Sequence, residues 1–441
     1  MSEARSRFER LLDDPDILIY GVTSGPGRNA HVRLSPSERK AQAARLPTAP
    51  AVSWGEPLPG RVTRAIVFAR LANFVEGHAA VTPALANGVA AMLGDGPLPA
   101  VPARGQGGAG EILSLSHLFL PLARSMQLKE KESNALINGS PAATGLVADG
   151  ALAAARRLEL CAEVFALAAE AFDTPLGHFD EGLDDYWNNP HDAWALDRLR
   201  CLMDGGHGGA RRPYQAPVSF RIVPRILGQA RLAATVACEV AEDSLPAISD
   251  NPALLPPDSD NPNGRAVSTG GFHNAQVPTA LDMVTAAYAN LCVLAERCGA
   301  KIMDGAVSDP PSQAAAKEAL ASVGYLPMAI TGYEEEARAL ASATLLPGSE
   351  SGGFGQNDVA SPVFLAWSKQ ERAGLLLEQS LAALAPVALA ALDCADRPVP
   401  SPLQTLADTV RRHVQLDRQA AALGPMTADL ANWLRDRIYD A

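Results

Sequence analysis

Apolar residues recur at helical spacing along most of this chain, and in several stretches the pattern continues over many turns. These stretches are 62–92, 219–241, 274–304 and 363–392. The last three are rich in alanine and leucine and nearly free of internal proline or glycine, which favours long helices. Alternation of β-branched residues between turns is almost confined to 17–22 and 266–268, the candidate strands. The pattern predicts an all-α chain.

The length of the chain limits how these helices can pack. At 441 residues it exceeds the size at which one compact core usually stops growing, so either two domains or one elongated helical body is expected. A hydrophobic fraction of 47 % with 20 % charged residues is ordinary for a globular protein, and a large core can therefore form.

Charge and cysteine content exclude several classes of protein. The 37 basic and 49 acidic residues give a formal charge of -12 without any cluster of Lys and Arg, which argues against a nucleic acid or an anionic membrane as partner. The N-terminus runs into acidic residues rather than an apolar segment, so we expect a cytoplasmic protein without signal peptide or membrane anchor. The six cysteines form no CxxC pair, which favours reduced thiols over disulfides or a metal site.

Glycine and proline gather in a few patches that we expect to be loops, where functional side chains are often found. Tyr20 precedes a glycine-rich turn and could transfer a proton, although a packing role is the more common one for such a residue. The glycine-rich run 105–110 precedes an apolar helical stretch. It lacks the Lys-Ser/Thr ending of a phosphate loop and follows no strand, so we do not expect it to bind phosphate.

Three further polar residues stand beside small residues in apolar surroundings. Asn138 interrupts an apolar run at an expected helix start, where capping and ligand binding are about equally plausible roles. Arg221 enters a long helix and is suited to a carboxylate, although a structural ion pair is the default for such a residue. Asn357 also precedes a helix, where capping is the default role.

Several segments match, in order and along nearly the whole chain, the motifs of one family. The matches are Tyr20-Gly21-Val22 with YGV-x-TG, 107–117 (GGAGEILSLSH) with GASGDLAPLAH, 135–139 with ALING, 215–228 with QDPYSLRCQPQV-x-G, 250–252 with DNP, 272–273 with NFHG, and 356–358 with QED or NQD. The chain therefore resembles the aromatic amino acid ammonia-lyases, the histidine and phenylalanine ammonia-lyases.

The resemblance implies an architecture. In that family an elongated bundle of long helices carries a loop-rich active-site head. This chain would then be one ammonia-lyase-like unit with the head in 1–190 and the long-helix bundle and C-terminal helices in 191–441. The resemblance also implies a homotetramer whose active sites are assembled from several subunits.

The resemblance also implies roles for individual residues. Family members eliminate ammonia from an aromatic amino acid to give an unsaturated acid. Tyr20 would take the β-proton, Asn138 would hold the substrate or the surroundings of the electrophile, and Arg221 would bind the substrate carboxylate. Gln215, Asn357 and Phe272 would complete the substrate-binding set, without a metal.

The electrophile of the family is a methylidene-imidazolone made from an Ala-Ser-Gly triplet, and here the triplet is Gly108-Ala109-Gly110. Alanine has no hydroxyl to eliminate, so we expect this cofactor to be absent. The family's second tyrosine is replaced by Val218 and its neighbouring aspartate by Ala216, while Asn357 replaces an acidic residue. The usual reaction is therefore not expected at a useful rate.

Three interpretations stay open. The chain could be a lyase that acts without the cofactor on a small carboxylate or amino acid substrate with a more acidic proton or a better leaving group. It could be a non-catalytic paralogue that serves as a binding or assembly subunit. Alternatively, Ala109 could be an engineered replacement of serine in an ordinary ammonia-lyase.

Overall fold

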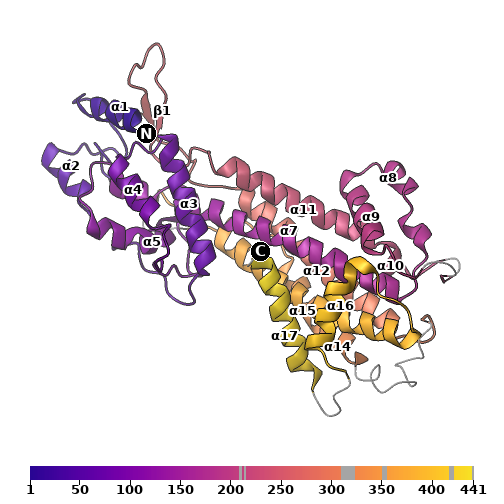
Figure 1. Ribbon diagram of the computed structural model, residues 1–441. Helices are drawn as coiled ribbons and strands as arrows, with labels where there is room; N and C mark the ends of the chain where they lie inside the picture. Colours follow the sequence, from indigo (N-terminus) through magenta and orange to yellow (C-terminus); the bar gives the residue numbers. More distant parts are fainter. Residues whose placement is uncertain (208–210, 213–214, 309–322, 350–354, 417–421, 440–441) are drawn as a thin grey trace. The chain divides into compact units, whose positions relative to one another are not determined.

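The computed structural model describes residues 1–207, 211–212, 215–308, 323–349, 355–416 and 422–439 (Figure 1). In these residues the named strands are β1 (Ala253–Leu255) and β2 (Arg265–Val267), which pair antiparallel. All other named elements of this part of the chain are helical. The prediction of an all-α protein is therefore confirmed, and β2 lies where one of the two candidate strands was expected.

The chain divides into two compact units that alternate along the sequence. Unit 1 contains Met1–Gly150, Ala237–Leu281 and Ala343–Ser368, and unit 2 contains Ala151–Val236, Asp282–Ser342 and Lys369–Ala441. Each change of unit but one falls inside a long helix. These helices are α7 (Pro141–Ala171), α11 (Val223–Ser244), α12 (Gln276–Ile302) and α15 (Val363–Ala395). A division at residue 190, as expected from the sequence, does not coincide with these units.

Unit 1 contains six shorter helices and two 3-10 turns besides its share of the long helices. They are α1 (Ser2–Leu12), α2 (Pro36–Ala43), α3 (Gly60–Glu76), α4 (Pro83–Ala91), α5 (Ile112–Ser125), α6 (Glu132–Ile137), η1 (Gly27–Asn29) and η2 (Ala109–Glu111). The single long helix expected over 62–92 is wrong. Gly77 ends α3 with φ 90°, and Thr82 caps α4 by accepting the N–H of Leu85 at 3.3 Å.

The segment 17–22 is a turn rather than the expected strand. The carbonyl oxygen of Ile19 accepts the N–H groups of Val22, Thr23 and Ser24 at 3.0–3.1 Å, which coils the backbone. Ile19 and Val22 are nevertheless buried, in a small cluster with Phe8 of α1. Burial in this cluster explains the apolar pattern that the sequence showed here.

Unit 2 carries the remaining named helices of the residues that the structure describes. They are η3 (Leu176–Phe179), α8 (Gly182–Trp187), α9 (Pro190–Leu202), α10 (Val218–Arg221), α14 (Leu326–Leu340), η5 (Ser401–Leu403), α16 (Gln404–His413) and α17 (Leu423–Tyr439). The helix expected over 219–241 is realised as α10 and α11, while those over 274–304 and 363–392 are α12 and α15.

A buried charge network attaches the C-terminal helix of unit 2. The guanidinium of Arg157, which is fully buried, donates to Glu378 at 2.8 Å and to the Tyr439 hydroxyl at 2.9 Å. Arg435 donates to the other oxygen of Glu378 at 2.9 Å. Since breaking a buried pair leaves an uncompensated charge, this network fixes α17 firmly.

Two helices, α12 and α15, are long and apolar enough to cross a membrane by composition alone. Of their most apolar windows, however, 67 % and 89 % are buried inside the protein, as in helices that form a core.

The cysteines are free thiols, and Cys161, Cys292 and Cys298 are buried whereas Cys201 is exposed. Burial raises the pKa of Cys292 to about 12 and so keeps its thiol protonated.

Helices α3 and α7 approach each other at a glycine, which gives a stability prediction. A Cβ on Gly145 would lie 2.7 Å from the backbone nitrogen of Ile66, so we expect Gly145→Ala to lower the free energy of unfolding by about 1–3 kcal/mol. A Cβ on Gly332, inside α14, would have nothing within 4 Å of it. Gly332→Ala should therefore stabilise by about 0.5–1 kcal/mol, and urea unfolding of both variants would measure the contrast. Equal changes in the free energy of unfolding in the two variants would contradict the close approach of α3 and α7 at Gly145.

Candidate active site

A cavity of about 700 Å³ opens in unit 1, a volume within the range of roughly 300–1,000 Å³ that ligand pockets show. Residues from separate parts of the sequence share its lining. Those predicted from the sequence are Tyr20, Ala109, Gly110, Asn138, Phe272 and Asn357. The structure therefore brings together the proposed base, the altered triplet and three polar or aromatic candidates.

Tyr20 is held by a compact turn. Its phenolic oxygen accepts the N–H of Gly27 at 3.0 Å, at the start of η1. Gly21 follows with φ 68°, a conformation that favours glycine, and its carbonyl accepts the side-chain amide of Gln42 from α2. The half-buried hydroxyl is thus fixed at the cavity wall and carries one donor that would stabilise negative charge on it.

The triplet forms the start of a tight turn. Gly110 has φ 63°, and a Cβ there would lie 3.2 Å from the ring of Phe272, so only glycine fits this position without movement. The carbonyl of Gly108 accepts the N–H of Ser361 at 3.3 Å. Ala109 lies between these two fixed glycines and is half-buried at the cavity.

Glu111 joins this turn to the start of α7. Its two carboxyl oxygens accept the N–H groups of Ala142 and Ala143 at 2.6 and 2.7 Å, which are free donors in the first turn of the helix. Burial raises the pKa of Glu111 to about 8, although these two N–H groups and the charge of Arg70 oppose the rise. Sequence reasoning missed this residue. An acidic residue directly after the glycine-rich run, ahead of an apolar stretch, was the available signal.

Asn138 is the C-cap residue of α6 and precedes α7 by three residues, so it does not cap the start of α7, which was the alternative to a binding role. Its side-chain oxygen accepts the N–H groups of Gly139 at 2.8 Å and Asn251 at 3.1 Å. Its main-chain carbonyl accepts a hydrogen bond from the guanidinium of Arg70. Because these contacts occupy its oxygens, the amide nitrogen of Asn138 is the atom left to donate to a ligand in the cavity.

A buried charged cluster supports this arrangement. The nearest carboxyl oxygen of Asp250 lies 3.6 Å from Arg70 and 3.8 Å from Lys131, whose ammonium donates to the Ala79 carbonyl at 2.7 Å. Burial lowers the pKa of Lys131 to about 8, and Asp250 opposes the change. Arg70 and Lys131 were not predicted as site residues because their importance depends on burial, which the sequence does not display.

Arg221 and Gln215, the other predicted substrate-binding residues, lie in unit 2. Gln215 is exposed, and Arg221 ends the short helix α10 with its Nε buried and without a hydrogen-bond partner. Beside them, His178 accepts the N–H of Ala216 at 3.1 Å. Burial and the charge of Arg221 lower the pKa of His178, which favours the neutral imidazole.

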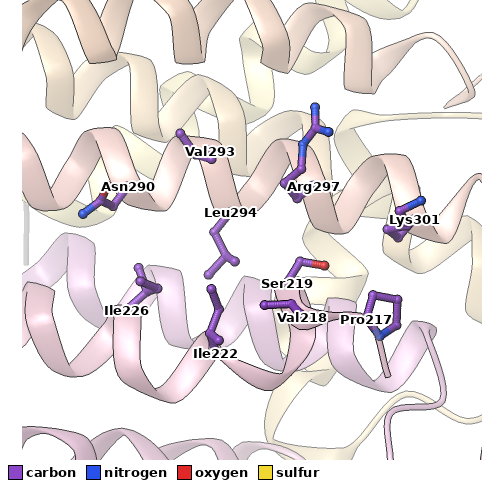
Figure 2. Close-up of a pocket in the computed structure, with 10 residues that line it drawn as sticks. All are labelled: Pro217, Val218, Ser219, Ile222, Ile226, Asn290, Val293, Leu294, Arg297 and Lys301. Carbon is purple, nitrogen blue, oxygen red and sulfur yellow. The ribbon is translucent and has the colours of Figure 1, made fainter. Parts of the chain in front are cut away.

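Val218 occupies the place where the motif match puts a tyrosine. It is 56 % exposed and lines an apolar groove of about 480 Å³ in unit 2. Figure 2 shows Ile222 and Leu294 pointing toward each other across this groove, with Val218 and Ser219 beside them. A hydroxyl-bearing side chain has thus been replaced by an apolar one on an apolar surface.

Comparison with known proteins decides the family. A sequence model of the aromatic amino acid lyases matches residues 1–125 and 123–415. The chain belongs to this family. Members of the family carry out carbon–nitrogen lyase chemistry, as the names of the relatives below indicate.

Two histidine ammonia-lyases illustrate the relationship in sequence. The enzyme of Symbiobacterium thermophilum is 28 % identical over 339 residues, covering 71 % of this chain and 66 % of the relative. That of Geobacillus thermodenitrificans is 28 % identical over 323 residues, covering 66 % and 63 %. The matched region thus spans slightly less than two thirds of these relatives.

Solved structures share the fold of this chain. Histidine ammonia-lyase from Trypanosoma cruzi aligns with a TM-score of 0.84 at 19 % identity, covering 99 % of this chain and 87 % of the other. Ergothionase from Treponema denticola, an ergothioneine-degrading enzyme, aligns with 0.87 at 16 % identity, covering 100 % and 93 %. The helical bundle fold expected from the motifs is therefore confirmed.

No metal site accompanies the cavity in the part of the chain that the structure describes, where no three His, Cys, Asp or Glu side chains come close enough to hold an ion. The polar groups that line the cavity are instead hydroxyl, amide, guanidinium, ammonium and carboxylate groups. Such groups bind and orient a substrate and transfer protons.

The position of Glu111 predicts a pH dependence of stability. Its pKa of about 8 in the folded protein lies above the ordinary 4.5, so the unfolded chain releases this proton first. The free energy of unfolding contributed by Glu111 is therefore fully present below about pH 4.5 and declines as the pH rises toward about 8. In Glu111→Gln this decline should disappear from urea-unfolding midpoints measured across that range.

Glu76→Gln is the matched control, because Glu76 is an exposed carboxylate at the end of α3. The slope of stability against pH should be the same in this variant as in the unchanged protein. An unchanged slope in Glu111→Gln would show that Glu111 ionises normally in the folded state.

Proposed function

We propose that this protein is a lyase that eliminates an amine from an amino acid or related carboxylate without a methylidene-imidazolone, with Tyr20 as the base. The observation that carries the proposal is that Tyr20 and Asn138 line the same cavity as Ala109. The proton-transferring and orienting groups are present in one place, whereas the residue that would form the electrophile is replaced.

The residues present do not fit the family's cofactor. Formation of the methylidene requires a side-chain hydroxyl that leaves as water, and Ala109 carries only a methyl group. The glycines on both sides and Glu111 keep a tight turn here even so. No step of the proposed reaction therefore passes through a cofactor.

In the proposed step the oxygen of Tyr20, as phenolate, takes the β-proton of the substrate. The C–H electron pair forms the carbon–carbon double bond, and the amine departs with the electrons of the C–N bond. Asn138 orients the substrate through its free amide nitrogen. General base catalysis of this kind contributes about 10²–10⁴-fold to a rate, less than the full acceleration by typical enzymes.

The substrate must therefore contribute part of the driving force. A better leaving group than ammonia or a more acidic β-proton reduces the barrier that an electrophile otherwise lowers. Ergothionase, which shares the fold, degrades ergothioneine. A betaine of that kind carries a quaternary nitrogen, which leaves more readily than a primary amine. This chemistry supports a betaine or a similarly activated amino acid as the substrate class.

Binding of the substrate carboxylate is assigned to Arg221, assisted by Gln215. The unpartnered Nε of Arg221 is a free donor, and a guanidinium forms paired hydrogen bonds with a carboxylate.

We further propose that the protein is a homotetramer in which several subunits contribute to each site. The exposed apolar surface at Val218 and the groove beside it supports burial by another subunit.

Replacement of the base tests the reaction. Tyr20→Phe retains the ring but removes the hydroxyl, so turnover of amino acids or betaines in a substrate screen should fall about 10²–10⁴-fold. Tyr186→Phe is the control because Tyr186 is 88 % exposed on α8 and should leave the rate unchanged. Unchanged turnover in Tyr20→Phe would contradict the assignment of the base. Failure to detect any turnover would favour the binding or assembly subunit.

Mass spectrometry tests cofactor and assembly on one sample. Under denaturing conditions the subunit should have the mass of the unmodified chain, because Ala109 loses no water. Under native conditions the mass should correspond to a tetramer. A subunit lighter by one water would refute the first expectation, and a native monomer the second.

A further inference from the structure

Two arginines on one wall of the cavity are not used by the proposed reaction. Arg39 lies on α2 and Arg45 lies just beyond its end, and both line the cavity that Tyr20 lines. The Nε of Arg39 is buried without a hydrogen-bond partner. Its nearest carboxylate, Glu130, lies 3.9 Å from Nη2, which is beyond hydrogen-bond distance. Arg39 therefore has free donors at the cavity.

Arg45 adds a second uncommitted charge. Its main chain is held, since its carbonyl accepts the hydroxyl of Ser133 at 2.6 Å. In the described part of the chain its guanidinium makes no hydrogen bond or ion pair. In the described residues Glu130 is the one carboxylate within ion-pair distance of either guanidinium group, and it pairs with Arg39 alone.

The other carboxylate of this wall makes no ion pair with either arginine in the described residues. Glu38 is engaged in the capping box of α2, where its carboxyl group accepts the N–H of Ser35 at 2.8 Å and the hydroxyl of Ser35 at 2.7 Å. Because the amide of Gln42 binds the carbonyl of Gly21, this helix is also tied to the turn that carries Tyr20. The wall that carries Arg39 is therefore held in place beside Tyr20.

We propose that Arg39, with Arg45, binds a second anionic group of the substrate, so that the cavity takes an amino acid or betaine whose distal end carries a carboxylate or comparable anion. The inference rests on the proposed function, because it assumes that Arg221 and not Arg39 binds the α-carboxylate of the substrate. A guanidinium with free N–H groups pairs with such an anion through two parallel hydrogen bonds.

A third cavity residue agrees with this assignment. Asn357 lines the same cavity at the position where the QED form of the family motif has an acidic residue. An acidic side chain there would repel an anionic substrate, whereas the neutral amide does not and can donate a hydrogen bond. Relative to that form, the neutral side chain of Asn357 and the unpartnered Nε of Arg39 both favour an anionic group in the cavity.

Binding of two matched acids tests the proposal without requiring turnover. The probes are trans-cinnamate and trans-4-carboxycinnamate, which share a skeleton and differ by the distal carboxylate. In isothermal titration calorimetry on the full chain, the dicarboxylate should bind at least about tenfold more tightly, a difference typical of one charged hydrogen-bonded pair. In Arg39→Met this preference should largely disappear, and in Arg39→Lys part of it should remain.

Lys40→Met is the matched control, since it removes one exposed positive charge from the same helix but does not line the cavity. The preference for the dicarboxylate should persist in it. Equal affinities of the unchanged protein for both acids, or no binding of either at millimolar concentration, would overturn the proposal. An equal loss for both acids in Arg39→Met would overturn it too, because Arg39 would then bind the shared carboxylate.

The two proposals can fail separately. A dicarboxylate preference that depends on Arg39, together with unchanged turnover in Tyr20→Phe, would contradict the base but leave the anionic subsite standing. Loss of turnover in Tyr20→Phe without a dicarboxylate preference would support Tyr20 as the base but contradict the anionic subsite.

Discussion

The carboxylate of Glu111 at the first turn of α7 is the contact on which the geometry of the candidate site depends. It satisfies two buried N–H groups that would otherwise lack partners and fixes the turn that carries Ala109. The same turn places Gly110 against Phe272. Removing Glu111 would leave the start of a 31-residue helix uncapped inside the protein. The altered triplet is therefore supported as firmly as a functional loop would be.

Around this contact the cavity has an uneven distribution of charge. The side of Asn138 is backed by buried groups of both signs, with Asp250 between Arg70 and Lys131. The side of α2 presents guanidinium groups with few partners. We propose that this distribution acts on the choice of substrate more than on stability, because a charged substrate interacts with it directly.

The sequence predicted the long helices and the family because both depend on local pattern. The stretch 274–304 has an apolar period that only a helix satisfies, and Tyr20, Ala109 and Asn138 stand inside recognisable motifs. The sequence-based prediction was wrong where a single residue determines the local backbone. Gly77, for example, ends a helix within an otherwise continuous helical pattern. The prediction was also wrong for 17–22, where one carbonyl accepts several N–H groups. Lys131 and Arg39 could not be found, since burial and missing partners are properties of the folded chain.

The turn of Tyr20 is stabilised by its own hydrogen bonds, centred on the carbonyl of Ile19, and the triplet turn is stabilised separately by Glu111 and Ser361. Neither set of contacts uses the side chain of residue 109. In evolutionary terms the turn of Tyr20 and the turn of Ala109 are therefore independent modules. Residue 109 can be substituted in a lineage while Tyr20 keeps its position, and selection can then act on the tyrosine alone.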